Sequence, residues 1–207
     1  KAKKIQSSML DRLILSNEKI NQIIKSVEEI IKFKDPLGKN LSSWKRPNGL
    51  NIKRISIPIG VIGIIYESRP NVTSDVSSLC FKTGNAVILR GGSEAFYSNK
   101  ILSNLFKKAL RKKNCNVNCI QFVEKKDRSN VDYLLSEMKD YIDIIIPRGG
   151  KGLIQFVIEN STVPTLQTGE GNCHLFVDET AKLDDALDIL VNSKTQRLGV
   201  CNACETL

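Results

Sequence analysis

Apolar residues recur along the chain with two different spacings. Between residues 20 and 31 they fall at helical intervals, with Ser16 placed to cap the helix and Asp35-Pro36 ending the pattern. From residue 61 onward, short continuous apolar runs alternate with amphipathic stretches. We therefore expect strands at 61–66, 86–90, 119–123, 143–146 and 163–167, and helices at 74–82, 94–112, 130–139 and 151–159.

Continuous apolar strands separated by helices are typical of a parallel sheet that is covered on both faces. The pattern predicts an α/β fold with a doubly wound parallel sheet. Within it, Thr73 is placed to cap the helix at 74–82, Gly84 to end that helix, and Asn114 to stop the helix at 94–112. Before the sheet, the helix-breaking residues of 44–51 predict a loop, and a strand follows near Ile52.

The pattern changes after Gln167. We expect a strand at 173–177, a helix that Asp184 caps, and then a loop around Gly199-Val200-Cys201-Asn202. The chain is therefore divided into a first domain, residues 1–166, which includes the N-terminal helices, and the beginning of a second α/β domain, residues 167–207.

Composition narrows the functional classes. The apolar runs are shorter than the roughly 20 residues that span a bilayer, and the N-terminus lacks the pattern of a secretory signal, so we expect a cytoplasmic protein without a membrane partner. The formal charge of +9 is compatible with a nucleic-acid-binding module. Because the lysines are scattered and no aromatic stacking surface accompanies them, we favour solvated faces and no nucleic-acid partner.

Three predicted strand ends combine glycine or proline with a cation just before a helix. They are 67–73, 90–94 and 147–152. In parallel sheets, ligands bind at the carboxyl ends of the strands, where helix N-termini present free N–H groups to phosphates. One such turn is ordinary, but three in one sheet favour a ligand that carries phosphate.

The six cysteines fit reduced thiols better than a disulfide scaffold. Cys201 follows a glycine-containing loop, and a lone cysteine there is more often structural than catalytic. Cys201 and Cys204 also form a Cys-x-x-Cys pair, which suits a redox couple or half of a zinc site. A zinc site would need Cys115 and Cys119 as its second half, at a wider spacing, so we expect no metal.

Four stretches in order, 61–73, 84–95, 171–174 and 200–206, resemble the signatures of the gamma-glutamyl phosphate reductases, a branch of the aldehyde dehydrogenase superfamily. The resemblance covers nearly the whole chain. It implies the superfamily's cofactor domain, NADPH as cofactor, and reduction of L-glutamate 5-phosphate to L-glutamate 5-semialdehyde and phosphate in proline synthesis.

The resemblance also implies roles for single residues. Cys201 matches the nucleophile that forms a thioester, and Asn71 matches the side-chain amide that holds the oxyanion. The leaving phosphate needs positive charge, for which Arg69, Arg148 and Arg197 are the candidates.

For the cofactor, Arg90 matches a lysine that contacts the adenosine ribose. Ser93 falls where members that prefer NAD carry a glutamate, so that the 2′-phosphate of NADPH is admitted beside Gly91 and Gly92. Gly149 and Gly150 match the turn that faces the pyrophosphate.

Two departures from the superfamily pattern qualify this interpretation. First, Gln167 stands near the position of a glutamate base in hydrolytic members, with Glu170 nearby. Second, the superfamily's catalytic domain continues well past the nucleophile, so the resemblance implies an internal fragment of a homo-oligomeric enzyme, inactive alone. The role of Cys204 stays open. The alternatives are another acylating aldehyde dehydrogenase, with a CoA thioester or a different acyl phosphate as substrate, and a non-catalytic nucleotide-binding or nucleic-acid-binding module.

Overall fold

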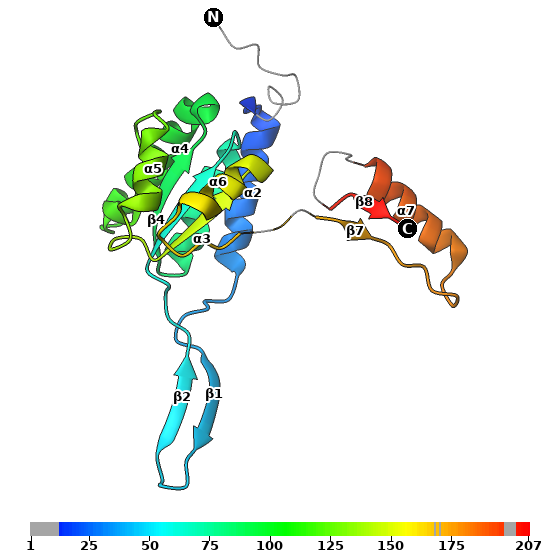
Figure 1. Cartoon of the computed structure of the whole chain (residues 1–207), viewed down its shortest axis with the longest axis horizontal. Coiled ribbons are helices and arrows are strands. Elements are labelled where there is room, and N and C mark those ends of the chain that lie inside the picture. The colour runs from blue at the N-terminus through cyan, green and yellow to red at the C-terminus, as the bar shows by residue number, and fades with distance from the viewer. Residues whose placement is uncertain (1–12, 168, 170, 197–201) are drawn as a thin grey trace, which may run out of the picture. The chain divides into compact units, whose positions relative to one another are not determined.

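The computed structural model describes residues 13–167, 169, 171–196 and 202–207 (Figure 1). The chain divides into two compact units, residues 1–167 and residues 168–207, and each is described by itself. The assignment of the two predicted domains to cofactor binding and catalysis stays a prediction.

The first unit contains a four-stranded parallel sheet in the order β5-β4-β3-β6. A fifth strand at 163–167 is not formed: this run contacts β6 through one isolated bridge, between Ile145 and Thr165. Pro164 has no N–H group to donate to a ladder, which limits the pairing. The strand bounds are β3 (Val61–Tyr66), β4 (Ala86–Gly91), β5 (Ile120–Phe122) and β6 (Ile144–Arg148).

Helices cover both faces of this sheet. α3 (Pro70–Lys82) and α4 (Phe96–Lys112) share a buried apolar cluster with alternate residues of β3 and β4. α5 (Ser129–Ser136) and α6 (Lys151–Asn160) share a second cluster with Ile65 and Ile145, which point to the opposite face. The predicted doubly wound α/β fold is confirmed. Two single-turn helices, η1 (Ser93–Ala95) and η2 (Val117–Cys119), precede α4 and β5.

Helix ends follow local chemistry. Ser16 caps α2 (Asn17–Lys32), as predicted, and its hydroxyl accepts the N–H of Lys19. α3 begins at Pro70, four residues earlier than predicted, because proline fixes φ and needs no N–H partner in the first turn. Thr73 is therefore inside the helix and does not cap it. Gly84 and Asn114 follow α3 and α4 with positive φ, as expected for helix stops.

Residues 40–55 form a hairpin, where the sequence predicts a loop over 44–51. β1 (Asn40–Lys45) pairs antiparallel with β2 (Asn51–Ile55), and the turn is confined to residues 46–50. The predicted strand near Ile52 is confirmed as β2, whereas the loop prediction was wrong for Trp44 and Lys45 of β1 and for Asn51, the first residue of β2. Both strands are almost entirely exposed, so they have no core face to mark them with alternating apolar residues.

The second unit is small. β7 (Cys173–His174) pairs parallel with β8 (Cys204–Thr206), and α7 (Leu183–Thr195) packs against β8. β7 is shorter than the predicted strand. Lys182 is the N-cap of α7, so Asp184 lies in its first turn, where a carboxylate complements the helix dipole. In the described part of the chain, no helix has the length and apolar character needed to cross a membrane.

Candidate functional site

The carboxyl ends of three strands are level with one another. Tyr66, the last residue of β3, pairs with Gly91 on one side and with Arg148 on the other. The turns that follow these three residues therefore leave the same edge of the sheet. The three strand ends predicted to hold a phosphate-bearing ligand are brought together.

The β3–α3 turn places Arg69 and Asn71 at the start of α3. Arg69 is the N-cap residue and is half-buried, while Asn71 is exposed in the first helical turn. The Asn71 amide donates to the Asp75 carboxylate at 3.1 Å, and that carboxylate also accepts from Ser26 of α2 at 2.9 Å. An amide nitrogen carries two protons, so Asn71 retains one N–H beyond this bond.

A buried chain of hydrogen bonds lies beneath this turn. Thr73 donates to Asn99 Oδ1 of α4 at 3.1 Å, and Tyr66 OH lies 2.6 Å from Thr73 Oγ1. All three side chains are almost completely buried. Burial raises the pKa of Tyr66 to about 12, although the bond to Thr73 opposes this shift. The phenol therefore stays protonated at neutral pH.

Arg90 is buried and links two backbone segments. Its guanidinium donates to the carbonyl oxygens of Gly91 and Lys126, the latter at 3.1 Å, and the side chain is only 8% exposed. Burial lowers the pKa of Arg90, which the Glu94 carboxylate partly offsets. Arg90 thereby joins the β4–α4 turn to the loop after β5. Its Nε has no hydrogen-bond partner.

The β4–α4 turn depends on close packing. A Cβ atom on Gly91 would lie 2.2 Å from Asn99 Nδ2 and 3.0 Å from the Tyr66 ring, so only glycine fits. A Cβ on Gly92 would lie 2.9 Å from the Glu94 carboxylate. Ser93 begins η1 and is exposed.

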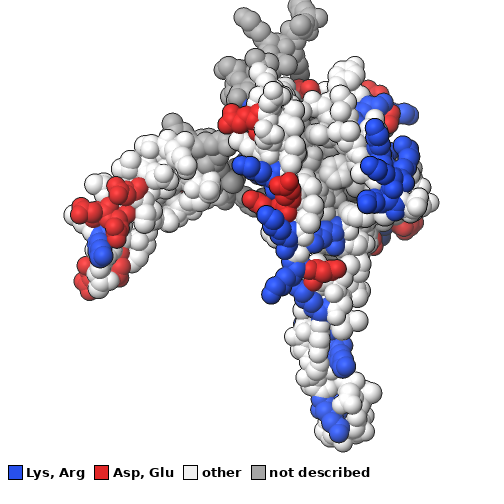
Figure 2. Space-filling view, turned by 180° about the vertical axis from the view of Figure 1, so that it is seen from behind, with Lys and Arg blue, Asp and Glu red and all other residues white. Residues whose placement is uncertain are grey.

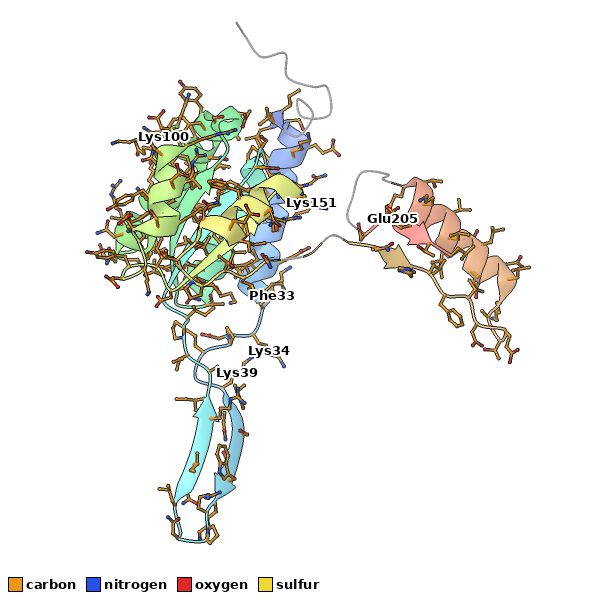
Figure 3. All side chains as sticks on the ribbon, in the orientation of Figure 1. Phe33, Lys34, Lys39, Lys100, Lys151 and Glu205 are labelled. Carbon is orange, nitrogen blue, oxygen red and sulfur yellow. The ribbon has the colours of Figure 1, made fainter. Side chains whose placement is uncertain are left out.

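The loop after β5 lies along the first turns of α4. Lys126 Nζ is 4.3 Å from the centre of the Tyr97 ring and 4.7 Å from that of Phe96. Lys100, labelled in Figure 3, forms an ion pair with Glu124 at 2.7 Å. These contacts place a short basic segment beside the β4–α4 turn.

The β6–α6 turn contains an internal carboxylate. Glu67 Oε2 accepts the N–H of Gly150, the N-cap of α6, at 3.0 Å. A Cβ on Gly149 would lie 2.7 Å from the Glu67 carboxyl carbon, so this glycine permits the approach. Lys151, the first residue of α6, is exposed (Figure 3). An anion therefore already lies at a helix start that was expected to face a pyrophosphate.

The residues at this edge fit a dinucleotide. A Cβ on Gly150 would find no atom nearer than 3.9 Å, and one on Gly152 would find none within 4 Å. The start of α6 is thus open to the close approach of a ligand. Together with exposed Ser93, it offers donors and space for phosphate groups, whereas the unpartnered Nε of Arg90 is buried.

An apolar cavity of about 520 Å³ lies on the α3 side of the sheet. Arg148, at the end of β6, and Asp75 are the charged residues on its wall. Of the arginines expected to hold the substrate phosphate, Arg69 and Arg148 thus lie at the same sheet edge. The apolar wall comprises residues such as Leu37, Ile57, Ile59, Ile62, Ile64, Val72, Val76, Leu79 and Ile146.

Cys201, Arg197 and Glu170 lie outside the described residues. Cys204 is buried in β8, and its thiol lies 3.2 Å from the carbonyl oxygen of Thr206. Gln167 is exposed at the end of the first unit. Among the residues that the structure describes, no group of three His, Cys, Asp or Glu side chains is placed to hold a metal.

Charge is distributed differently over the two units. Figure 2 shows Lys and Arg interspersed with Asp and Glu on the visible face of the first unit, with blue residues also grouped at one side. On the second unit, acidic residues predominate in the same view, and α7 contributes Asp184, Asp185 and Asp188.

Sequence reasoning missed three residues at this edge. Glu67 was seen only as part of a motif, although its position one residue after a buried strand places it at the sheet edge. Thr73 was interpreted as a cap, and Asn99 was not singled out. A polar residue amid the apolar positions of α4 is the signal that identifies Asn99.

Comparison with known proteins identifies close relatives. The chain is 53% identical over all 207 residues to a gamma-glutamyl phosphate reductase of Moorella thermoacetica, and 50% identical over 207 residues to one of Clostridium tetani. It spans 49% and 48% of these two proteins, so it covers about half the length of the curated relatives it matches. No protein-family model matches the chain.

Solved structures agree. The gamma-glutamyl phosphate reductase of Thermotoga maritima superposes with a TM-score of 0.89 at 48% identity, over 97% of this chain and 48% of that one. The yeast enzyme from Saccharomyces cerevisiae gives 0.72 at 26% identity, over 98% of this chain and 50% of that one. A propionaldehyde dehydrogenase of Rhodopseudomonas palustris, at 20% identity and a TM-score of 0.63, covers 91% of this chain and 48% of its own and shares the fold. Over its full length, and over about half of theirs, the chain is thus similar to gamma-glutamyl phosphate reductases.

Proposed function

We propose that the chain is the cofactor-binding part, with the start of the catalytic part, of an NADPH-dependent reductase that converts L-glutamate 5-phosphate to L-glutamate 5-semialdehyde and phosphate. This reaction serves proline synthesis. The observation that supports the proposal most is the common level of Tyr66, Gly91 and Arg148, which gathers the three candidate turns at one sheet edge.

The proposed reaction proceeds in two stages. The Cys201 thiolate attacks the acyl carbon, a C–S bond forms, the bond between the acyl carbon and the bridging phosphate oxygen breaks, and phosphate leaves. When bound, NADPH supplies the hydride that reduces this thioester. The C–S bond then breaks, which releases the aldehyde and restores the thiolate.

The described residues serve the first stage by stabilising charge. Asn71 uses its second amide proton to hold the oxyanion, and its bond to Asp75 fixes the orientation of the amide. Arg69 and Arg148, and Arg197 outside the described residues, neutralise the leaving phosphate.

Cofactor binding is assigned to the other two turns. The Arg90, Gly91, Gly92 and Ser93 turn receives the adenosine ribose and its 2′-phosphate, while Gly149 and Gly150 receive the pyrophosphate. Arg90 acts mainly by holding the Lys126 loop against this turn, since both of its terminal nitrogens donate to backbone carbonyls. For Gly150 to serve the pyrophosphate, the Glu67 carboxylate has to move aside.

The proposal includes a cytoplasmic location, a homo-oligomeric full-length enzyme and no nucleic-acid partner. It rests on the family and on the fold rather than on charge. Size-exclusion chromatography with light scattering on the full-length enzyme tests the oligomer. Binding of RNA or DNA that weakens steeply with salt would contradict the last part.

The test uses a full-length reductase that contains this chain. We expect phosphate-dependent reduction of NADP with glutamate 5-semialdehyde, abolished by Cys201→Ser and retained by Cys204→Ser. Asn71→Ala lowers kcat by about 10²–10³-fold, as expected for loss of an oxyanion donor. Phosphate-independent turnover would indicate another acylating aldehyde dehydrogenase. Absence of turnover by a folded wild type would contradict the proposal.

A further inference from the structure

The direction of the buried hydrogen bonds beneath α3 is fixed by the number of available protons. Thr73 has one hydroxyl proton and donates it to Asn99 Oδ1 at 3.1 Å. The Tyr66 hydroxyl, 2.6 Å away, therefore donates to Thr73 Oγ1. Thr73 is the middle member of a chain that runs from the end of β3 to α4.

This chain ties together the two turns that bear the candidate site. Thr73 lies in the first turn of α3, two residues after Asn71. Tyr66 precedes that turn directly, and its ring contacts the Cα side of Gly91 at the end of β4. Asn99 also packs on Gly91, since its Nδ2 lies 2.2 Å from where a Cβ would be. Thr73 thus fixes the start of α3 relative to the β4–α4 turn.

Neighbouring polar residues in the same helix interface make no such tie. Ser77 of α3 and Ser103 of α4 are as deeply buried as Thr73, yet their hydroxyl oxygens have no hydrogen-bond partner. The interface therefore contains both a linking hydroxyl and hydroxyls of the same burial that link nothing. The second kind supplies a matched control for the first.

We propose that Thr73 is a positioning residue for Asn71. Its two hydrogen bonds hold the first turn of α3 so that the Asn71 amide lies at a set distance from the β4–α4 turn. This inference rests on the proposed role of Asn71 as oxyanion donor. An oxyanion exists only in the transition state, so a misplaced donor lowers kcat and leaves substrate and cofactor binding nearly unchanged.

The experiment compares three variants of the full-length reductase by steady-state kinetics. Thr73→Val keeps the branched shape and removes both hydrogen bonds, and we expect kcat to fall by about tenfold with KM for NADP changed less than twofold. Thr73→Ser keeps a hydroxyl, and its kcat is expected to lie within about threefold of the wild-type value. Ser77→Ala leaves both constants as in the wild type.

Tyr66→Phe provides a second route if Thr73→Val does not fold. It removes one of the two bonds, and kcat is expected to fall by about threefold with KM for NADP unchanged. Thermal unfolding of each variant is recorded beside the kinetics. The inference is overturned if Thr73→Val or Tyr66→Phe lowers kcat no more than Ser77→Ala does. It is also overturned if Thr73→Ser is as impaired as Thr73→Val, or if KM rises in step with the fall of kcat.

Asn71→Ala separates this inference from the function on which it rests. A large loss of kcat in Asn71→Ala together with full activity in Thr73→Val removes the positioning role and leaves the reductase assignment intact. Full activity in Asn71→Ala removes the oxyanion role itself and the inference with it.

Discussion

The two pairs of helices that cover the sheet are held by different chemistry. α5 and α6 bury only apolar side chains, namely Val131, Leu134, Leu135 and Val157. α3 and α4 bury Thr73, Ser74, Ser77, Asn99 and Ser103 among their apolar contacts. Apolar burial fixes volume but tolerates small shifts, whereas hydrogen bonds fix direction. α3, whose first turn carries Asn71, belongs to the pair with buried polar groups.

The comparison also has an energetic side. A buried hydroxyl without a partner costs free energy, and several on α3 and α4 have none. The α5 and α6 pair carries no such cost among its described buried side chains. We therefore expect substitutions of buried apolar residues in α5 to lower the free energy of unfolding most. Substitutions of buried polar residues in α3 should instead alter the geometry of the candidate site.

The largest expected effect is on the apolar side. Leu135→Ala removes a side chain with 0% exposure and should lower the free energy of unfolding by about 2–5 kcal/mol. Urea unfolding followed by far-UV circular dichroism measures it, with Ser136→Ala, at the exposed neighbouring residue, as the control. A loss below about 1 kcal/mol would show that this cluster is loosely packed and would break the comparison.

The next effect tests close packing on the polar side. Gly91→Ala forces a Cβ against Asn99 and Tyr66, and should cost about 1–3 kcal/mol of unfolding free energy. Asn99→Ala opens space at the same point, so the double variant should be more stable than the sum of the two losses predicts. Additive losses in this double-mutant cycle would mean that Gly91 does not contact Asn99 in solution.

A smaller effect appears at high pH. The folded state raises the pKa of Tyr66 from 10.0 to about 12, so the unfolded chain loses this proton first. Stability from this group is complete below pH 10 and is lost between pH 10 and about 12, by on the order of 2 kcal/mol. Tyr66→Phe should flatten this part of the stability curve, while Tyr133→Phe, at an exposed tyrosine, should not. Equal slopes in both variants would contradict a buried phenol.

The smallest effect concerns the start of α6, where the Gly150 N–H donates to the Glu67 carboxylate. Glu67→Gln keeps an acceptor for the Gly150 N–H and removes a negative charge, so NADP should bind the full-length enzyme about threefold more tightly. Isothermal titration calorimetry measures this. Asp143→Asn is the matched control. Asp143 accepts the N–H of Val61 at 2.7 Å, at the amino end of β3, and Glu67 follows the carboxyl end of that strand. Weaker binding in Glu67→Gln would show that the carboxylate supports the cofactor turn.

The sequence predicted the parts of the fold whose signals are local. β3 has the predicted bounds because a continuous apolar run marks a strand buried on both faces. Ser16, Gly84 and Asn114 were identified because capping depends on the residue itself. Of the hairpin, the strand near Ile52 was predicted but β1 was not, because an exposed strand has no buried face to mark it. The start of α3 was predicted too late because Thr73 was interpreted apart from Pro70.

For the site, the sequence predicted which turns converge but not what the side chains do there. In a parallel sheet the carboxyl ends of all strands lie at one edge, so this edge could be expected as the place of the site. The bond from Thr73 to Asn99 joins residues 26 positions apart, and that from Glu67 to Gly150 joins residues 83 apart. Such contacts depend on packing between elements, which periodicity does not report. The roles proposed for Asn71, Arg90 and Cys201 stay predictions.

The exposed hairpin has a consequence for spectroscopy. Trp44 is the single tryptophan of the chain and lies in β1, 46% exposed. Intrinsic tryptophan emission therefore originates in a two-stranded ribbon whose strands pair with each other and not with the parallel sheet. The native spectrum should already be red-shifted, and collisional quenchers such as acrylamide should reach the indole before any denaturant is added. Thermal unfolding followed by tryptophan emission would therefore report the loss of pairing between β1 and β2. An unchanged emission signal is compatible with a parallel sheet that has already unfolded.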